Sequence, residues 1–408
     1  MSRTHSPEAG GSSTERRWGE APTKRILVFH VRAGAGHERA ARAVERATQQ
    51  IDPSAEVIVR DALDYGSPFF KAFYASTYNR MVARMPRVWG FVYRRSERTP
   101  IEGFRQELRT RLTLWNCRGY MEAVERHNPD AILCTQFLPA EVFAFLRERG
   151  RVRVPVACAI TDYSIHPIWV YRGIDRYYVA ADAVREELAD TGVVPEERIE
   201  VTGVPIDPRF AITMPASDAR RALGLDPDPS RMTILLMGGG FGWGPIEGML
   251  EIVRELPASV QALVIAGRNE QLRKRLLHRS RGHEDRIKVH GFTDQMDLFM
   301  AASDLIVGKS GGLTSSEAMA RGLPMVIFRP IPGQEERNCD FLQENGAALR
   351  THDLDELHYR LRHFLAAPEH LLEMRARAAA IGRPRSAFEV ARSILGRLTP
   401  LAADGRIT

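Results

Sequence analysis

Glycine-rich loops carry most of the residues in this sequence that could do chemistry. Two of them, 238–244 and 309–317, each follow an apolar run and precede an amphipathic stretch. Glycine permits a sharp turn and a close approach between backbone and ligand. Backbone N–H groups at the start of a helix attract anions. These loops therefore predict a binding site for a diphosphate, although neither has the GxxxxGKS/T pattern of a P-loop.

A third loop adds a candidate general base. Residues 34–36 (Gly-Ala-Gly) lead into His37. Imidazole titrates near neutrality and can accept the proton of an attacking alcohol. Asp162 directly follows another apolar run, and it could either orient His37 or bind the acceptor. The alternative is a surface histidine on an ordinary turn and an aspartate that caps a turn.

Apolar runs that alternate with amphipathic stretches must position these loops. The predicted strands are 25–31, 131–134, 155–160, 233–237, 262–266, 287–289, 305–307 and 325–328, with a helix over 182–191 among the intervening segments. Strands that alternate with helices predict a parallel sheet covered on both faces. Open parallel sheets bind ligands at the carboxyl ends of their strands. The three loops all follow predicted strands in this way.

A length of 408 residues suits two α/β domains of similar size. We predict a disordered tail over 1–23, a first Rossmann-like domain over 24–205, a Pro- and Asp-rich linker over 206–231, a second Rossmann-like domain over 232–385, and a C-terminal helix over 386–408 that could cross back to the first domain. The DxD sequence from Asp226 to Asp228 lies in the linker and is interpreted as a turn. No metal site is therefore predicted.

The composition limits the cellular compartment and the classes of binding partner that can be expected for this protein. The four cysteines are scattered, without disulfide or zinc spacing, and no apolar stretch is long enough for a membrane span or a signal peptide. These features favour the cytoplasm. The net charge of +6 is concentrated in residues 60–118, which hold twelve Arg or Lys and five Asp or Glu. Charge alone is weak evidence for nucleic acid, no nucleic-acid motif is present, and none is predicted as a partner.

Aromatic and basic residues alternate within 65–118. The aromatic residues include Phe69, Phe70, Phe73, Tyr74, Tyr78, Trp89, Phe91 and Tyr93, and the basic ones include Lys71, Arg80, Arg84, Arg87, Arg94, Arg95 and Arg98. Apolar anchors combined with positive charge are typical of an element that lies on an anionic membrane surface. The alternative is a pair of ordinary domain helices with aromatic residues in the core.

Taken together, the motifs resemble a known family, the processive diacylglycerol glucosyltransferases of bacteria and the related monogalactosyldiacylglycerol synthases of plastids. The resemblance runs from about Arg25 to about Leu349. It rests on the GxGH loop ending at His37, on TDYSIHPIW at 161–169, on DRY at 175–177 and on TGVPI at 202–206. Ser310 departs from the proline or alanine common in relatives, which leaves the backbone role of that loop intact.

The resemblance implies an inverting enzyme of the GT-B fold, with two parallel sheets facing a central cleft. It implies transfer of glucose or galactose from a UDP-sugar to diacylglycerol or glycosyl-diacylglycerol, with His37 and Asp162 as the catalytic residues. The implied donor-binding residues are Gly238, Gly239, Gly240, Phe292, Thr293, Gly311, Gly312, Leu313, Thr314, Glu317, Gln334 and Glu335. Among them, Glu317 would hold the ribose, Gln334 and Glu335 the hexose, and Phe292 and Thr293 would lie beside the uracil.

No cofactor is expected, since helix N-termini and backbone amides can stabilise the leaving diphosphate without a metal. The expected location is the cytoplasmic face of a membrane, as a peripheral protein. Two alternatives remain open: a UDP-N-acetylglucosamine-dependent transferase that acts on another lipid, like the more distantly related enzyme that makes lipid II, and a UDP-sugar epimerase. The sequence does not distinguish a glucose donor from a galactose donor, nor fix the number of sugars added.

Overall fold

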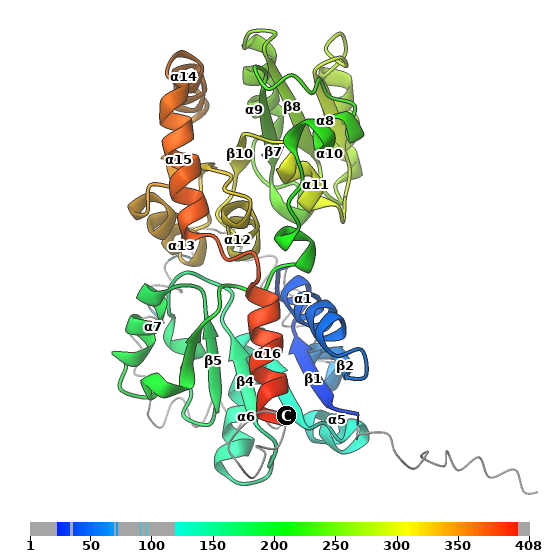
Figure 1. Cartoon of the computed structure of the whole chain (residues 1–408), viewed down its shortest axis with the longest axis vertical. Coiled ribbons are helices and arrows are strands. Elements are labelled where there is room, and N and C mark those ends of the chain that lie inside the picture. Colours follow the sequence, from blue (N-terminus) through cyan, green and yellow to red (C-terminus); the bar gives the residue numbers. More distant parts are fainter. Residues whose placement is uncertain are drawn as a thin grey trace, which may run out of the picture.

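The computed structural model contains two α/β units, one above the other in Figure 1. It describes residues 23–32, 36–68 and 119–398, together with Lys71, Gly90 and Arg95. The predicted tail, except its last residue, lies outside the described residues. So do nearly all of the aromatic and basic segment 65–118 and the last ten residues of the predicted C-terminal segment.

The N-terminal unit is built on a parallel sheet of six strands in the order β2-β1-β3-β4-β5-β6. The strands are β1 (Arg25–His30), β2 (Glu56–Asp61), β3 (Ala131–Cys134), β4 (Val156–Ala159), β5 (Arg176–Val179) and β6 (Ile199–Val201). Its helices include α1 (Gly36–Ile51), α5 (Gly119–His127), α6 (Phe137–Glu148) and α7 (Asp182–Ala189). Ile26 and Val28 pack into one cluster and Leu27 and Phe29 into another, so both faces of β1 are buried.

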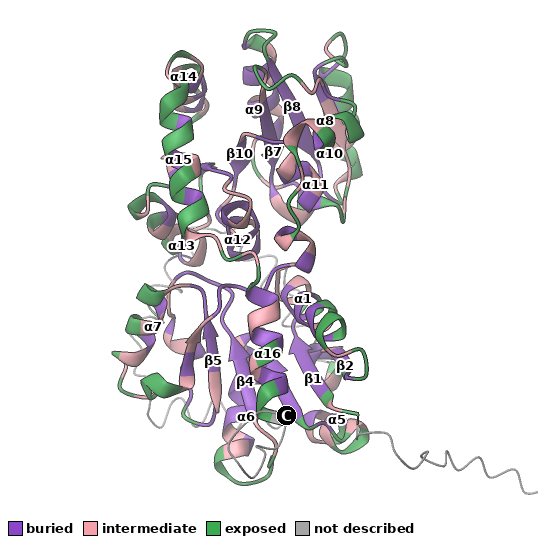
Figure 2. Ribbon diagram, viewed as in Figure 1, coloured by how far each residue is buried: buried purple, intermediate pink, exposed green. Residues whose placement is uncertain are grey.

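The C-terminal unit repeats this plan, with a parallel sheet in the order β12-β11-β10-β7-β8-β9. The strands are β7 (Met232–Met237), β8 (Val260–Ile265), β9 (Ile287–His290), β10 (Leu305–Gly308), β11 (Met325–Phe328) and β12 (Ala348–Thr351). The helices are α9 (Ile246–Glu255), α10 (Glu270–Arg279), α11 (Met296–Ala301), α12 (Gly312–Ala320), α13 (Gln334–Glu344), α14 (Leu354–Ala366) and α15 (Pro368–Ile381). The inner strands of both sheets, such as β3, β4, β8 and β10, are buried, whereas α14 and α15 expose one side (Figure 2). The predicted α/β class with two parallel sheets is confirmed.

Short helices occupy the segment for which the sequence predicts a linker. They are η4 (Pro208–Ala211) and α8 (Ala216–Ala222). Arg220 of α8 is only 2% exposed, and its guanidinium donates to Asp304 at 2.7 Å. Much of 206–231 therefore packs as part of the C-terminal unit.

The last helix, α16 (Ser386–Leu398), begins at the junction of the two units and lies against the N-terminal sheet, although it follows the C-terminal unit in the chain (Figure 1). Val390 and Ile394 share a buried cluster with Ile26 and Val28 of β1. The hydroxyl of Tyr178 in β5 donates to Ser393 at 3.1 Å. The chain thus crosses between the two units twice. None of the helices in the described ranges is long and apolar enough to cross a membrane.

Candidate active site

A cavity of about 250 Å³ lies between the two units. Helix α1 supplies one wall, the η4 segment a second, and loops at the carboxyl ends of the C-terminal strands the rest. Of the residues predicted to bind the donor, those that line this cavity are Gly239, Gly240, Phe292, Thr293, Leu313, Thr314 and Glu317. The structure therefore gathers at one place residues of the loops 238–244 and 309–317 and of the segment 292–293.

Gly312 determines how closely the two units approach each other. A Cβ atom at this position would lie 1.8 Å from the carbonyl oxygen of Thr161 and 3.2 Å from a carboxylate oxygen of Asp162. Only glycine allows the first turn of α12 to touch the N-terminal unit so closely. Gly238 has a comparable constraint inside its own loop, where a Cβ would lie 2.0 Å from the carbonyl oxygen of Trp243. These glycines shape the site without lining the cavity.

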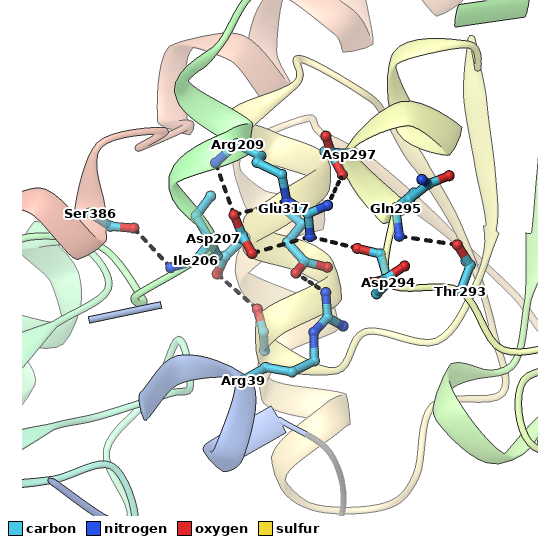
Figure 3. Close-up of polar contacts among 12 residues, drawn as sticks. Arg39, Ile206, Asp207, Arg209, Thr293, Asp294, Gln295, Asp297, Glu317 and Ser386 are labelled. Atoms are coloured by element: carbon cyan, nitrogen blue, oxygen red, sulfur yellow. Dashed lines mark hydrogen bonds and ion pairs between the residues drawn. The ribbon is translucent and has the colours of Figure 1, made fainter. Parts of the chain in front are cut away.

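Glu317 lies one turn into α12 and is 1% exposed. Its Oε1 atom accepts a hydrogen bond from the guanidinium of Arg39, which reaches across from α1 (Figure 3). Its Oε2 atom is buried and has no hydrogen-bond partner among the described residues. Burial raises the pKa of Glu317 to about 7 despite the opposing effect of Arg39. This carboxylate can therefore accept further hydrogen bonds from a ligand in the cavity.

A second charged network forms another wall of the cavity (Figure 3). Asp207, the N-cap of η4, is paired with Arg46 of α1 and with Arg209, 3.1 Å away. Arg209 is also 3.4 Å from Asp297 of α11. Sequence reasoning missed these residues because the segment 206–231 has no periodic pattern. The signal available was Asp-Pro directly after the TGVPI motif, which is typical of a helix start.

His37 lies in the first turn of α1, and its Nδ1 atom is 2.8 Å from the carbonyl oxygen of Thr135. This contact requires a proton on Nδ1 and leaves Nε2 as the basic nitrogen of the neutral ring. Burial lowers the pKa of His37 to about 4, so the imidazole is neutral at physiological pH. The ring centroid of Trp169 lies 6.2 Å away. His37 thus has the form required of a general base.

Asp162 accepts hydrogen bonds from the C-terminal unit. Its Oδ1 atom is 2.9 Å from Nε2 of Gln334 and 3.2 Å from Nδ2 of Asn338. Burial raises the pKa of Asp162 to about 6, against the effect of these two amides. Because Nδ1 of His37 is bound to Thr135, a backbone carbonyl orients the imidazole where the sequence analysis had offered Asp162. The second option, that Asp162 binds the acceptor, stays a prediction.

Gln334 and Glu335, predicted to bind the hexose, lie beside the cavity described above and do not line it. Gln334 contacts Asp162. Glu335 accepts a hydrogen bond from the backbone N–H of Ile331 at 2.8 Å and pairs with Lys309 at 3.0 Å. Their hexose role remains a prediction.

The described residues contain no cluster of three or more His, Cys, Asp or Glu side chains that could hold a metal ion. Asp226 of the DxD sequence pairs with Arg231 at 2.9 Å and accepts a hydrogen bond from the backbone N–H of Asp228 at 3.0 Å. These contacts are those of a turn.

Comparison with known proteins shows which families and relatives the chain resembles. Residues 37–206 match the model of monogalactosyldiacylglycerol (MGDG) synthase, and residues 231–383 match the model of glycosyl transferases group 1. The two halves of the chain are thus similar to these two families. Several relatives are named processive diacylglycerol beta-glucosyltransferase. One from Bacillus pumilus is 35% identical over 56% of this chain and 58% of its own length. One from Bacillus subtilis is 33% identical over 62% of this chain and 65% of its own length. Both alignments span less than two thirds of the relative. A third relative with that name, from Bacillus cereus (strain G9842), is 26% identical over 91% of this chain and 93% of its own length.

Solved structures share the fold at low sequence identity. MurG of Acinetobacter baumannii aligns with a TM-score of 0.59 and 16% identity over 91% of this chain and 99% of its own. S. aureus MnaA in complex with UDP aligns with the same TM-score and identity over 92% and 97%. Anabaena HepE in complex with UDP and glucose aligns with a TM-score of 0.52 and 16% identity. This alignment covers 92% of this chain and 99% of HepE. The predicted GT-B arrangement is confirmed.

Proposed function

We propose that this protein is an inverting glycosyltransferase that moves glucose or galactose from a UDP-sugar to diacylglycerol or glycosyl-diacylglycerol, forming a β-glycosyl lipid. One observation carries the proposal. On one side of the cavity between the two units lies the buried carboxylate of Glu317, one oxygen of which has no hydrogen-bond partner among the described residues. The helix on the other side carries in its first turn the neutral imidazole of His37, which is held by the carbonyl of Thr135. The match to the monogalactosyldiacylglycerol synthase model and the names of the relatives support the lipid acceptor.

The donor side of the proposal follows from α12. Thr314 lies in its first turn and lines the cavity, so the donor diphosphate would meet the positive end of the helix dipole there. Glu317, one turn further along, would accept hydrogen bonds from the ribose hydroxyls through its unpartnered oxygen. Phe292 is 55% exposed at the edge of the cavity, with the guanidinium of Arg268 4.7 Å from its ring centre, and it would lie beside the uracil.

The chemical step requires one proton transfer and one displacement. Nε2 of His37 takes the proton from the acceptor hydroxyl as its oxygen attacks the anomeric carbon of the sugar. The bond between that carbon and the diphosphate oxygen breaks, and UDP leaves with the electron pair. A single displacement inverts the configuration, so an α-linked donor yields a β-glycoside. The Thr135 carbonyl keeps the imidazole in the tautomer that this step requires.

We propose that charge on the leaving diphosphate is stabilised by the start of α12 and by arginines of the cavity. The cavity-lining arginines are Arg39, Arg42, Arg46, Arg209 and Arg268. Preorganised donors of this kind can stabilise a developing anion without a metal ion. Transfer is then expected to persist in EDTA. A strict requirement for Mg²⁺ would contradict this part of the proposal.

We further propose that the protein acts on the cytoplasmic face of a membrane, held there by the basic and aromatic residues of 65–118. Support comes from the sequence, because this segment lies outside the described residues. Sedimentation with vesicles should increase with the anionic lipid fraction and decrease with salt. Replacing Arg84, Arg87, Arg94 and Arg95 together by serine should remove most of this binding while leaving UDP affinity unchanged. Equal sedimentation of this variant would contradict the proposal.

The deciding experiment offers the purified protein UDP-glucose, UDP-galactose and UDP-N-acetylglucosamine, each with diacylglycerol in mixed micelles. Mass spectrometry should find a hexosyl-diacylglycerol with one of the first two donors. Transfer only from UDP-N-acetylglucosamine would favour the alternative lipid glycosyltransferase. Conversion of a UDP-sugar to its epimer without acceptor would favour an epimerase. Either result would overturn the proposal.

A further inference from the structure

Arg39 belongs to the N-terminal unit, yet its guanidinium donates a hydrogen bond to the carboxylate of Glu317, in the C-terminal unit (Figure 3). The contact joins α1 to α12, 278 residues further along the chain. The partners differ greatly in exposure, because the side chain of Arg39 is 40% exposed and that of Glu317 is 1% exposed. The arginine can therefore leave the contact into solvent-accessible space, whereas the carboxylate is fixed in the wall of the cavity.

The ion pair meets an electrostatic need of the empty site. A buried carboxylate without a counter-charge is costly. Glu317 has one oxygen paired with Arg39 and one oxygen without a partner among the described residues. A ligand that donates two hydroxyl groups to this carboxylate would satisfy the free oxygen directly, and at the other oxygen it would compete with the guanidinium.

In the filled site, the donor diphosphate would offer the displaced guanidinium a second anionic partner. Thr314 and Glu317 are three positions apart on α12, and both line the cavity. One helical turn advances about 5.4 Å, so the phosphate position at the start of α12 lies about one turn from Glu317. A guanidinium binds phosphate oxygens in a bidentate manner as readily as it binds a carboxylate.

We propose that Arg39 exchanges partners during donor binding: it pairs with Glu317 in the empty site and with the donor diphosphate in the filled site. The exchange frees both oxygens of Glu317 for the ribose. This inference rests on the proposed function, since it requires a nucleoside diphosphate in the cavity. Arg39 lies two residues after His37 in the same helix. The exchange therefore gives the unit that holds the base a direct contact with the donor.

The test compares UDP with uridine, which has the base and ribose but no phosphate. Calorimetric titration would be run on the unchanged protein, Arg39→Gln and Arg39→Lys. Arg39→Gln should weaken UDP binding roughly tenfold or more, the scale of a charge-assisted hydrogen bond. The affinity of this variant for uridine should equal or exceed that of the unchanged protein, because the arginine that competes with the ribose for Glu317 has been removed. Arg39→Lys should retain most of the UDP affinity.

The matched variant is Arg42→Gln, which removes the same charge from the same helix. Arg42 also lines the cavity but pairs with Glu45 at 2.9 Å, so its loss should not tighten uridine binding. Equal losses for UDP and uridine in Arg39→Gln, at an unchanged Tm, would make Arg39 a pocket wall only and would overturn the exchange. Unchanged UDP affinity would also overturn it. Absence of UDP binding by the unchanged protein would overturn the proposed function together with this inference.

Discussion

At the scale of single residues, burial leaves His37 in the form that its proposed task requires. The imidazole of His37 is neutral because burial lowers its pKa to about 4. The sequence allowed us to predict the base but not its orientation, because Thr135 contributes only a backbone carbonyl, and any residue type has one.

Replacing His37 by alanine tests the base. We expect kcat to fall by a factor of about 10²–10⁴, since a general base acts in the transition state. UDP affinity should change little, because His37 does not line the donor cavity. Turnover would be measured with the preferred UDP-sugar, and UDP affinity by calorimetry. Near-normal turnover, or a loss of UDP binding that accounts for the defect, would contradict the assignment.

The replacement Glu317→Gln tests the buried carboxylate through stability. Burial raises the pKa of Glu317 from 4.5 to about 7 in the folded protein, so between these values the folded state binds more protons than the unfolded state. The unchanged protein therefore loses stability from this group as pH rises from 4.5 to 7. The glutamine variant lacks this dependence. Its free energy of unfolding, relative to the unchanged protein, should rise by about 1–3 kcal/mol over that range. Denaturant titrations that give a constant difference would contradict the shift.

At the scale of elements, apolar runs identified the strands whose side chains are almost all apolar, such as β3 and β11. The sequence analysis did not predict β2, β5, β6 or β12. β6 has only three residues, and β5 and β12 contain arginines among four residues each. These four strands lie at or next to sheet edges, where polar side chains can reach solvent and the apolar signal weakens.

The first turn of α12 both contributes to the cavity and touches the N-terminal unit, so its residues are limited in size. Gly312→Ala should force the two units apart, because its Cβ would overlap the Thr161 carbonyl. We expect a loss of about 1–3 kcal/mol in stability, the usual cost of overpacking, together with a lower kcat. The control is Gly311→Ala, since a Cβ at Gly311 meets nothing within 4 Å. Thermal unfolding of the two variants would decide, and equal Tm values would contradict the argument.

At the scale of the whole molecule, the site belongs to neither unit alone. The loops of the C-terminal unit could be predicted, since glycines after apolar runs are a local signal. Arg39, Asp207 and Arg209 could not, because their roles depend on how the two units face each other. Asp207 joins Arg46 of α1 to Arg209, which in turn pairs with α11. Only the folded arrangement brings these three elements together.

Helix α16 makes the stability of the first unit depend on the end of the chain. Ile394 is 3% exposed and packs in the cluster that contains Ile26 and Val28. Ile394→Ala should cost about 2–5 kcal/mol. Hydrogen exchange should accelerate in β1, at the opposite end of the sequence, more than in β7. The control, Arg397→Ala, removes an exposed pair with Glu200 and should cost at most about 1 kcal/mol. Faster exchange confined to the C-terminal unit would contradict this coupling.

Helix α16 also affects how the protein folds during its synthesis. A ribosome delivers the N-terminus first, at about 5–20 residues per second, so the first sheet emerges well before α16 exists. The whole of 206–385 is translated in between, which takes on the order of 10–40 seconds at that rate. Throughout this interval the side of β1 that carries Ile26 and Val28 lacks the part of its native cover that α16 supplies. The domain that is made first is thus the last to be completed, and its nascent apolar face is where we expect chaperones to bind.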